Sequence, residues 1–535
     1  MIPYLTLHDP QSAARYYETG VWTRDTFYSL LAHWADTYPD QTALRDGWGA
    51  LSWRALRARV DGMADDLAAQ GLTQGDPVSI WMTSRVEVII TFLACSRNGL
   101  ACNPSLHKTY TCAEIVTLLK RLNTAALVTQ PGWGADRGTC DFDAMLGDVG
   151  SLRKVYTPEN FPAAAKSPAK EFHDNPDTIS YLAFTSGTTG VPKCVMHSAN
   201  TLMSNCRDLV ADWGVSHETV ILSLSPLSHH IGWVAVGQWL TSGGCLVTEN
   251  LRPGVSQVGW VIESGASYVL GVPTHAMDVL HAQKQQGLKR LGKVKTFYMA
   301  GAAIPEVVAE SFVQQGITPQ NIYGMTETSS HQYTHPDDDP SVWVSTCGRG
   351  GKSYEIAIFD MENPDLPAPL GETGQIGGRG GLLMLGYMGN QDATGDSFNR
   401  DGWFLSGDLG SLDAAGNLTV QGRLKDLIIR GGHNIYPSQI EAAALRHDNI
   451  DLAAAIAIAD DRLGERVCLA VKSDLDADQV LAHLAGVGLS KYDMPEWFLS
   501  VDDFPKTASG KVLKRELEAM VKRGEFTPQR IGKKG

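Results

Sequence analysis

Apolar residues recur along the first part of the chain with two different spacings. Helical spacing in segments 25–38 and 51–67 predicts amphipathic helices that each bury one face. Short apolar runs predict buried strands at 77–82, 179–184, 220–224, 268–271 and 294–299. Because such helices and strands alternate, we expect a largely parallel sheet, in which ligands bind beyond the carboxyl ends of the strands.

The pattern changes at about residue 340. Glycines then become dense and apolar runs shorten, which predicts a small β-rich subdomain. From about residue 424 the pattern predicts an α+β unit, with helices at 438–445 and 478–484 and strands at 452–459 and 467–471. A chain of 535 residues is too long for one hydrophobic core, so we expect at least two domains.

One polar loop has an unusual composition. Directly after the apolar run 179–184, the chain reads Thr-Ser-Gly-Thr-Thr-Gly-Val-Pro-Lys. Glycines permit close backbone approach, hydroxyls supply donors and a lysine supplies positive charge, and a triphosphate needs all three. The residues concerned are Thr185, Ser186, Gly187, Thr188, Thr189, Gly190 and Lys193. A solvated turn is the alternative for such a run, and the spacing of a P-loop ATPase is absent.

The bulk composition is that of an ordinary folded protein with an acidic surface. Hydrophobic residues make up 43% and charged residues 19% of the chain, and the net charge is −14. That charge disfavours nucleic acid or an anionic membrane surface as the main partner. No stretch approaches the roughly 20 apolar residues of a membrane-spanning helix, and the N-terminus lacks a secretory pattern. We therefore expect a cytoplasmic protein.

The nine cysteines are scattered and include no Cys-x-x-Cys pair. In a long chain without a secretory signal, we expect reduced thiols in the interior. Cys194 directly follows Lys193 in sequence, but we expect no catalytic role for it.

The loop at 185–193 resembles the signature loop of the adenylate-forming superfamily, which includes acyl- and aryl-CoA ligases, adenylation domains of peptide synthetases and beetle luciferases. Further segments resemble motifs of that superfamily in the same order along nearly the whole chain: Pro226-Leu-Ser-His229, Tyr323-Gly-Met-Thr-Glu327, Gly402-Trp-Phe-Leu-Ser-Gly-Asp408, Gly422-Arg-Leu-Lys-Asp426, Arg430-Gly-Gly-His-Asn-Ile-Tyr-Pro437 and Pro505-Lys-Thr-Ala-Ser-Gly-Lys511. The stretches 16–23 and 430–435 are most similar to the branch of cyclohexanecarboxylate-CoA and dihydroxybenzoate-AMP ligases.

The resemblance implies an α/β fold in two parts. The expected N-terminal domain, residues 1–422, has two αβ-layered sheets plus the β-rich subdomain, and the expected C-terminal domain, residues 423–535, is a small mobile α+β unit. The implied reaction joins a small carboxylic acid to ATP with Mg²⁺, giving an acyl-AMP and diphosphate, and then passes the acyl group to coenzyme A. The resemblance leaves open whether the protein forms a homodimer.

The resemblance also implies roles for single residues. The implied catalytic residues are Glu327, which matches the Mg²⁺ ligand, Thr326, which matches a phosphate contact, Lys511, which matches the lysine that reaches the α-phosphate and carboxylate, and His229. Besides the 185–193 loop, the residues expected to bind ATP or AMP are Gly301, Ala302, Tyr323, Asp408 and Arg423, of which Asp408 and Arg423 would hold the ribose.

The expected acid pocket consists of His229, His230, Trp233, Gly301, Gly324 and Met325. No Arg or Lys lies in these matched segments, so a dicarboxylate would lack a cationic partner. We therefore expect an alicyclic, aromatic or short-to-medium-chain monocarboxylate. In a second domain arrangement, a hinge at Lys425 would bring Arg430, Gly431, Gly432 and His433 to the coenzyme A side.

Three other readings of the sequence remain. The acyl group could go to the phosphopantetheine of a carrier protein instead of coenzyme A. A luciferase-like oxygenase would share the motifs. A non-catalytic nucleotide-binding regulator is disfavoured, because Lys193, Glu327, Asp408, Arg423 and Lys511 occur together.

Overall fold

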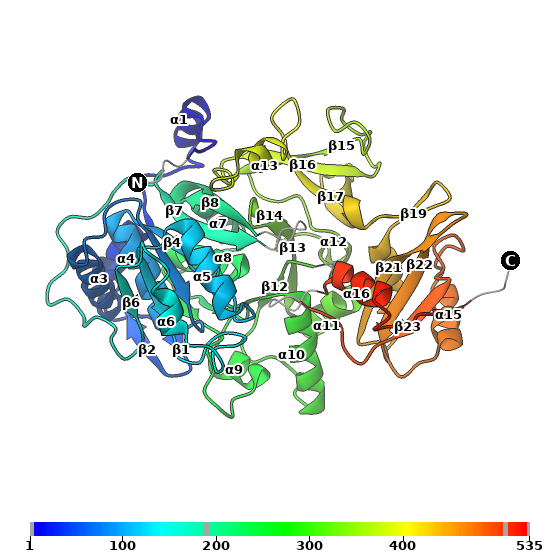
Figure 1. The fold of residues 1–535 in the computed structure, drawn as a ribbon, viewed down its shortest axis with the longest axis horizontal. Coiled ribbons are helices and arrows are strands. Elements are labelled where there is room, and N and C mark those ends of the chain that lie inside the picture. Colours follow the sequence, from blue (N-terminus) through cyan, green and yellow to red (C-terminus); the bar gives the residue numbers. More distant parts are fainter. Residues whose placement is uncertain (1–4, 186–191, 303, 507–511, 532–535) are drawn as a thin grey trace.

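A computed structural model describes residues 5–185, 192–302, 304–506 and 512–531, which form four sheets (Figure 1). The first sheet has the order β6-β5-β3-β4-β7-β8. Its strands are β3 (Pro77–Trp81), β4 (Ala101–Asn103), β5 (Ala126–Thr129), β6 (Lys154–Tyr156), β7 (Ile179–Thr185) and β8 (Lys193–Ser198). The strands pair in parallel except at β7–β8, where the chain returns antiparallel after the polar loop.

The second sheet has the order β14-β13-β12-β11-β9-β10-β1-β2. Its strands are β1 (Thr42–Asp46), β2 (Gly49–Ser52), β9 (Val220–Ser223), β10 (Cys245–Val247), β11 (Tyr268–Gly271), β12 (Thr296–Met299), β13 (Thr318–Met325) and β14 (Ser329–Tyr333). The central strands run in parallel. Their carboxyl ends therefore meet at one edge, as the alternation of helices and strands predicts.

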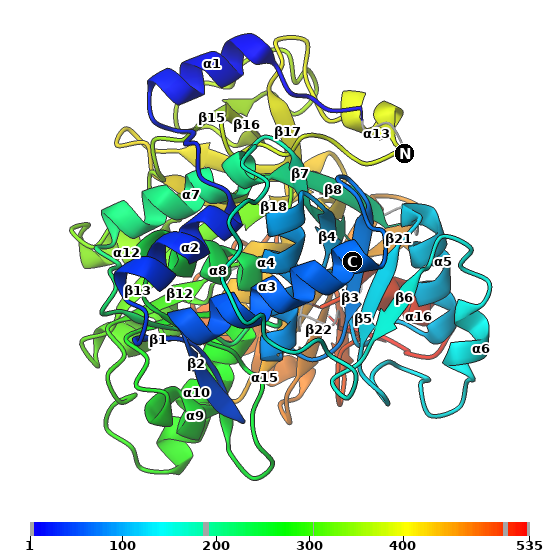
Figure 2. The same ribbon diagram turned by 90° about the vertical axis from the view of Figure 1, so that its left-hand side faces the viewer.

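Helices lie between and outside these two sheets (Figure 2). The largest apolar cluster joins both sheets through α2 (Phe27–Thr37), α3 (Trp53–Ala69), α4 (Val86–Asn98), α7 (Ala199–Asp212) and α8 (His230–Ser242). One outer face is covered by α5 (Cys112–Leu122) and α6 (Phe142–Leu146), and the other by α9 (Gln257–Glu263), α10 (Pro273–Gln285) and α11 (Glu306–Val313). The expected pair of layered sheets is confirmed.

The smaller parts of the molecule follow in sequence. The β-rich subdomain contains β15 (Tyr354–Phe359), β16 (Gly374–Gly380), β17 (Phe404–Leu412) and β18 (Leu418–Arg423), with α1 (Pro10–Glu18), α12 (Pro340–Ser345) and α13 (Gln391–Gly395) as the remaining helices. The C-terminal sheet contains β19 (Ile428–Arg430), β20 (His433–Ile435), β21 (Leu452–Asp460), β22 (Gly464–Lys472), β23 (Trp497–Ser500) and β24 (Gln529–Arg530), with α14 (Pro437–Ala444), α15 (Ala477–Gly486) and α16 (Lys514–Lys522). The small α+β unit predicted for the tail is confirmed.

Polar contacts join the C-terminal unit to the rest of the chain. Ser438 Oγ donates to the carbonyl of Gln421, and Arg446 Nη2 lies 2.9 Å from Glu306 Oε2 on α11. Both contacts are exposed or half-buried, so each contributes little to holding the two parts together. Within the described residues, no helix is both long and apolar enough to cross a bilayer.

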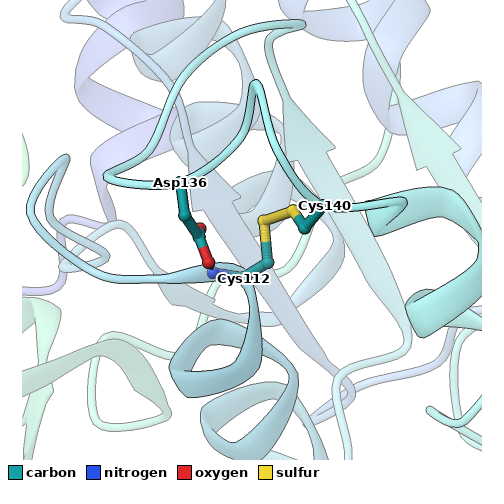
Figure 3. A group of neighbouring side chains, drawn as sticks. All are labelled: Cys112, Asp136 and Cys140. Carbon is teal, nitrogen blue, oxygen red and sulfur yellow. A yellow bond between two sulfur atoms is a disulfide. The ribbon is translucent and has the colours of Figure 1, made fainter.

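The structure corrects the expectation for two of the cysteines. A disulfide joins Cys112, the first residue of α5, to Cys140 in the loop that follows β5 (Figure 3). The other cysteines are free thiols, and Cys245 and Cys347 are only half-buried. Sequence spacing did not indicate this pair, because 28 residues separate the two sulfurs and only the path of the loop over α5 brings them together.

Candidate active site

A cavity of about 610 Å³ opens at the carboxyl ends of the strands in the second sheet. Residues of β7, β8, β13 and β14 and the segments that follow β9, β11 and β12 contribute to its wall, together with the strands β17 and β18 of the β-rich subdomain. The structure brings many of the expected residues to this wall: Thr185, Lys193, His229, His230, Gly301, Ala302, Gly324, Met325, Thr326, Glu327, Asp408, Arg423 and Lys425.

Other expected residues lie elsewhere. Ser186, Gly187, Thr188, Thr189, Gly190 and Lys511 lie outside the described residues. Trp233 does not line the cavity. Its ring is fully buried against Phe92, at a centroid distance of 4.2 Å, and its indole N–H donates to the carbonyl of Leu227. The core therefore takes up this side chain, which corrects the expectation that it shortens the pocket.

Glu327 provides a buried carboxylate on the wall. It follows the β13 strand, and the hydroxyl of Tyr387 donates to its Oε1 at 2.8 Å. Burial raises the pKa of Glu327, and the bond from Tyr387 and the charges of Lys193 and Arg423 oppose that rise. The Nζ of Lys193 lies 4.5 Å from the centre of the Tyr387 ring. The carboxylate thus faces a partly cationic part of the cavity.

The tight turn before Glu327 depends on Gly324. A Cβ at this position would lie 1.8 Å from the carbonyl oxygen of Ser329, so only glycine fits. Beyond it, the carbonyl of Thr326 accepts a hydrogen bond from His197 Nε2 at 2.7 Å. These two contacts fix the backbone that presents Thr326 and Glu327 to the cavity.

Asp408 and Arg423 face each other across the β17–β18 pair. They are register partners, and Arg423 Nε lies 3.3 Å from Asp408 Oδ1. The hydroxyl of Tyr323 donates to Asp408 Oδ2 at 2.9 Å, and burial raises the pKa of Tyr323, as does the Asp408 charge. Tyr323 does not line the cavity but supports Asp408 from behind. Its expected contact with adenine stays a prediction.

Neutral histidines form a second group of lining residues, which we call the neutral end of the cavity. The ring nitrogens of His230, at the start of α8, lie 3.3 Å from Tyr181 Oη and 3.2 Å from Ser329 Oγ. Burial lowers the pKa of His230 to about 3, and burial lowers the pKa of His275 to about 4. Both rings are therefore neutral at pH 7 and offer hydrogen bonds rather than charge.

Apolar groups complete that end. Gly301 has a φ of +91°, and a Cβ there would meet Ile231 and Val272 at 3.5 and 3.6 Å. Of the described residues that line the cavity, the cationic ones are Lys193, Arg423 and Lys425, none of which belongs to the segments of this end. Partial burial, with the charge of Arg423, lowers the pKa of Lys425 to about 8.

The residues expected on the coenzyme A side are not at the cavity in this structure. Arg430 and His433 pair across a hairpin, with Gly431 at φ 58° and Gly432 at φ 86° as its two-residue turn. Arg430 Nη2 lies 2.6 Å from Glu496 Oε1, and His433 Nε2 lies 3.3 Å from Asp493 Oδ1. The glycines therefore have a local structural role here, and their expected contact with coenzyme A stays a prediction.

Sequence reasoning missed several side chains of the site. Tyr387, which contacts Glu327, and the polar pocket residues His275, Ser329 and Ser330 all line the cavity. Ser329 and Ser330 closely follow Glu327, and Tyr387 lies in the glycine-dense stretch after about residue 340, but neither segment matches a motif that indicates binding. Only the folded chain shows that they share one wall.

Comparison with known proteins agrees with this geometry. Residues 31–388 match the family model described as AMP-binding enzyme, and residues 439–511 match the AMP-binding enzyme C-terminal domain. The chain belongs to the AMP-binding enzyme family. Among curated members, a medium-chain fatty-acid–CoA ligase of Escherichia coli (strain K12) is 27% identical, over 95% of this chain and 93% of the relative.

Two further members show the same full-length likeness. A feruloyl-CoA synthase from Amycolatopsis is 30% identical over 90% of this chain and 96% of its own length. The crystal structure of ATP-bound MatB from Rhodopseudomonas palustris superposes with a TM-score of 0.81 at 27% identity, covering 92% of this chain and 99% of that one. The two-part α/β fold of this AMP-binding enzyme is thus shared with a solved member of the family.

Proposed function

We propose that this AMP-binding enzyme is an ATP-dependent acid–CoA ligase. A carboxylic acid and ATP give an acyl-AMP and diphosphate, and the thiol of coenzyme A then displaces AMP to give an acyl-CoA. The observation that carries the proposal is the make-up of one cavity wall, which combines the charged residues Glu327, Asp408, Lys193 and Arg423, the charged end, with neutral histidines and apolar groups, the neutral end.

The nucleotide suits the charged end. A carboxylate that accepts from two vicinal hydroxyls binds a ribose, and Asp408 is oriented for this by Arg423 and Tyr323. Lys193 lies on the same side as Glu327 and would neutralise phosphate charge. Because the first step brings an anionic carboxylate against an anionic phosphate, these residues act by positioning and by charge.

Mg²⁺ fits at Glu327. The carboxylate is buried and lines the cavity, and its pKa is raised by burial, so a nearby cation would favour its charged form. Mg²⁺ accepts one or two carboxylates together with substrate phosphates. When bound, it would offset phosphate charge, while Tyr387 holds the Glu327 carboxylate in place.

The acid suits the neutral end. A carboxylate or other anionic group on the far side of the substrate would be desolvated against His230, His275 and the apolar groups around Gly301, none of which is cationic at pH 7. His230, Ser329 and the groups around Gly301 instead suit an uncharged body. We therefore propose an alicyclic, aromatic or short-to-medium-chain monocarboxylate as the substrate.

The C-terminal unit would supply the remaining groups. We propose that Lys511 reaches the reacting carboxylate in the first step and that rotation at Lys425 brings the Arg430–His433 hairpin to the cavity for the second. The exposed ion pair of Arg446 with Glu306, which holds the two parts together only weakly, supports such movement.

Matched pairs of acids test the proposal. The exchange of labelled diphosphate into ATP is measured with cyclohexanecarboxylate, benzoate and hexanoate, each beside the dicarboxylate of the same skeleton. We expect exchange with at least one monoacid and little with its diacid. A folded protein that exchanges diphosphate with none of a broad acid panel would refute the proposal.

The acceptor needs a separate measurement. Product analysis with coenzyme A, and then with a phosphopantetheinyl carrier protein, distinguishes a CoA ligase from a carrier-loading enzyme. We expect acyl-CoA and AMP with coenzyme A. Lys511→Ala should abolish adenylate formation, while Lys522→Ala, a change near the end of α16, should leave it intact.

A further inference from the structure

The Cys112–Cys140 pair lies at one end of a helix that contacts the site at both ends. Cys112 is the first residue of α5, and Asp136 Oδ1 accepts from its backbone N–H at 2.8 Å. Cys112 is buried, whereas Cys140 is half-buried on the loop that covers it (Figure 3). A reductant would therefore reach the sulfur of Cys140 first.

The segment just before Cys112 supports the neutral end of the cavity. The ring of His107 stacks on that of His229, which lines the cavity, with 4.2 Å between centroids and 21° between planes. Trp81 Nε1 donates to the carbonyl of His107 at 2.9 Å. The loop at 130–141 packs on this segment, since Ala135 N–H donates to the carbonyl of Tyr110.

The other end of α5 contacts residues on both sides of the 185–193 loop. Arg121, in its last turn, donates to the carbonyl of Pro192 at 2.5 Å. Its guanidinium also lies 5.5 Å from the centre of the Phe184 ring. A change in how Cys112 holds α5 would therefore affect two regions. One is the cavity wall at His229, and the other is the pair of strands β7 and β8 that flank the 185–193 loop.

We propose that Cys112 and Cys140 form a reversible redox tether that fixes the wall of the acid pocket through the segment 107–112. In the oxidised form, the bond ties the 130–141 loop to the start of α5 and limits the motion of His107. In the reduced form, the same segment keeps its hydrogen bonds but loses the covalent restraint. His107 is then a positioning residue for His229.

The chemistry balances with ordinary cellular reagents. Oxidation by a peroxide forms the sulfur–sulfur bond, as the two thiols lose two protons and two electrons and hydrogen peroxide becomes two waters. Reduction by a dithiol begins when its thiolate attacks Cys140 Sγ and releases Cys112 as the leaving thiolate. The second thiol of the reagent then closes its own disulfide and frees Cys140.

Peptide mapping tests the bond directly. Trypsin releases Cys112 in residues 109–120 and Cys140 in residues 138–153, each with one cysteine. After alkylation of free thiols, mass spectrometry of peroxide-treated protein should find these two peptides joined, and dithiothreitol should separate them. If the peptides stay separate at every peroxide concentration that leaves the protein folded, the proposal is wrong.

Hydrogen exchange and kinetics test the role of the bond. The amides of 107–112 should exchange faster in reduced protein and in Cys112→Ser and Cys140→Ser. KM for the acid should rise by about two- to fivefold in the same three samples, with kcat little changed. The matched control Cys245→Ser, at a free and half-buried thiol in β10, should respond to peroxide and dithiothreitol as the wild type does.

Two other results would overturn the proposed role of the Cys112–Cys140 bond. One is a bond that forms without altering either exchange or KM, which would make it a local crosslink only. The other is one equivalent of zinc held by the reduced protein and lost in Cys112→Ser, which would make Cys112, Asp136 and Cys140 a metal site. The KM measurement rests on the proposed function, but peptide mapping and hydrogen exchange do not. If the protein proved inactive as a ligase, these two measurements would still test the tether.

Discussion

The two ends of the cavity meet opposite electrostatic demands. At the charged end, the proposed nucleotide site, Asp408 is paired with Arg423, and Glu327 lies in a field that includes Lys193. At the neutral end, the proposed acid site, burial keeps His230 and His275 neutral at pH 7. One end thus offers fixed charge to a strongly charged ligand, and the described residues of the other end include no charged side chain.

The difference shows where each kind of group is useful. The phosphates and ribose are the same in every turnover, so oriented charges can be matched to them in advance. The acid must lose its carboxylate charge during the reaction, and an uncharged body is best met by uncharged walls. Each prediction below changes one end and leaves the other as it is.

The largest effect is expected at Asp408. Asp408→Ala removes the proposed ribose contact and leaves the Arg423 charge and the Tyr323 hydroxyl without their shared acceptor. We expect kcat/KM for ATP in diphosphate exchange to fall by about 10²- to 10³-fold. Asp401→Ala, at an exposed position in the same subdomain, is the control and should retain activity. An Asp408→Ala protein with normal kinetics would remove Asp408 from the nucleotide site.

A smaller effect is expected at Glu327. Glu327→Gln keeps the shape and the bond from Tyr387 but removes the charge that would hold Mg²⁺. We expect the Mg²⁺ concentration for half-maximal exchange to rise by about tenfold or more, which is a difference of about 1.4 kcal/mol in binding. Titration of activity with Mg²⁺ at saturating ATP measures it. An unchanged Mg²⁺ requirement would place the ion elsewhere.

Adding a cation to the acid end should change the choice of acid. Met325→Lys adds an ammonium group to the cavity wall, at a residue that packs near Tyr387, so a second carboxylate on the acid gains a cationic partner. We expect the kcat/KM ratio of adipate to hexanoate to rise by about tenfold. Met325→Gln matches the side-chain volume without the charge and should not raise the ratio. An equal rise in both variants would mean that size, not charge, limits the pocket.

The smallest effect concerns stability in acid. His197 is fully buried behind the Thr326 carbonyl, and burial lowers its pKa to about 4. Because the unfolded histidine takes up a proton near pH 6.5, the stability that His197 contributes is present above that pH and is lost as pH falls toward 4. This loss is about 2 kcal/mol at pH 5.

His197→Gln should therefore shrink the loss of unfolding free energy between pH 7 and pH 5 by about 2 kcal/mol. Chemical denaturation at the two pH values measures it. His33→Gln is the control, since that ring is exposed to solvent in the folded protein. If His197→Gln and His33→Gln lose the same stability as the wild type between these pH values, protonation of His197 does not contribute to acid unfolding.

Local sequence patterns predicted the helices and strands well but predicted poorly which side chains contact one another. The apolar run at 268–271 became β11 with the same bounds, and the run at 452–459 became β21 with one further residue. Trp233 was placed in the pocket because it lies one turn beyond His229, yet its ring packs on Phe92 in the core. Spacing along a helix gives the direction of a side chain only relative to its neighbours, and not which of two packed layers it enters.

The periodicity of the strands and helices, the glycine at 324 and the order of motifs that marks the family can all be seen in the amino-acid order alone. These properties depend on neighbours within a few residues, where sterics and hydrogen bonding are local. Three contacts depend on the folded arrangement: Tyr387 with Glu327, Tyr323 with Asp408, and Cys112 with Cys140. Those contacts join residues from 28 to 85 positions apart, and the packing of whole layers, not any local preference, sets their distance.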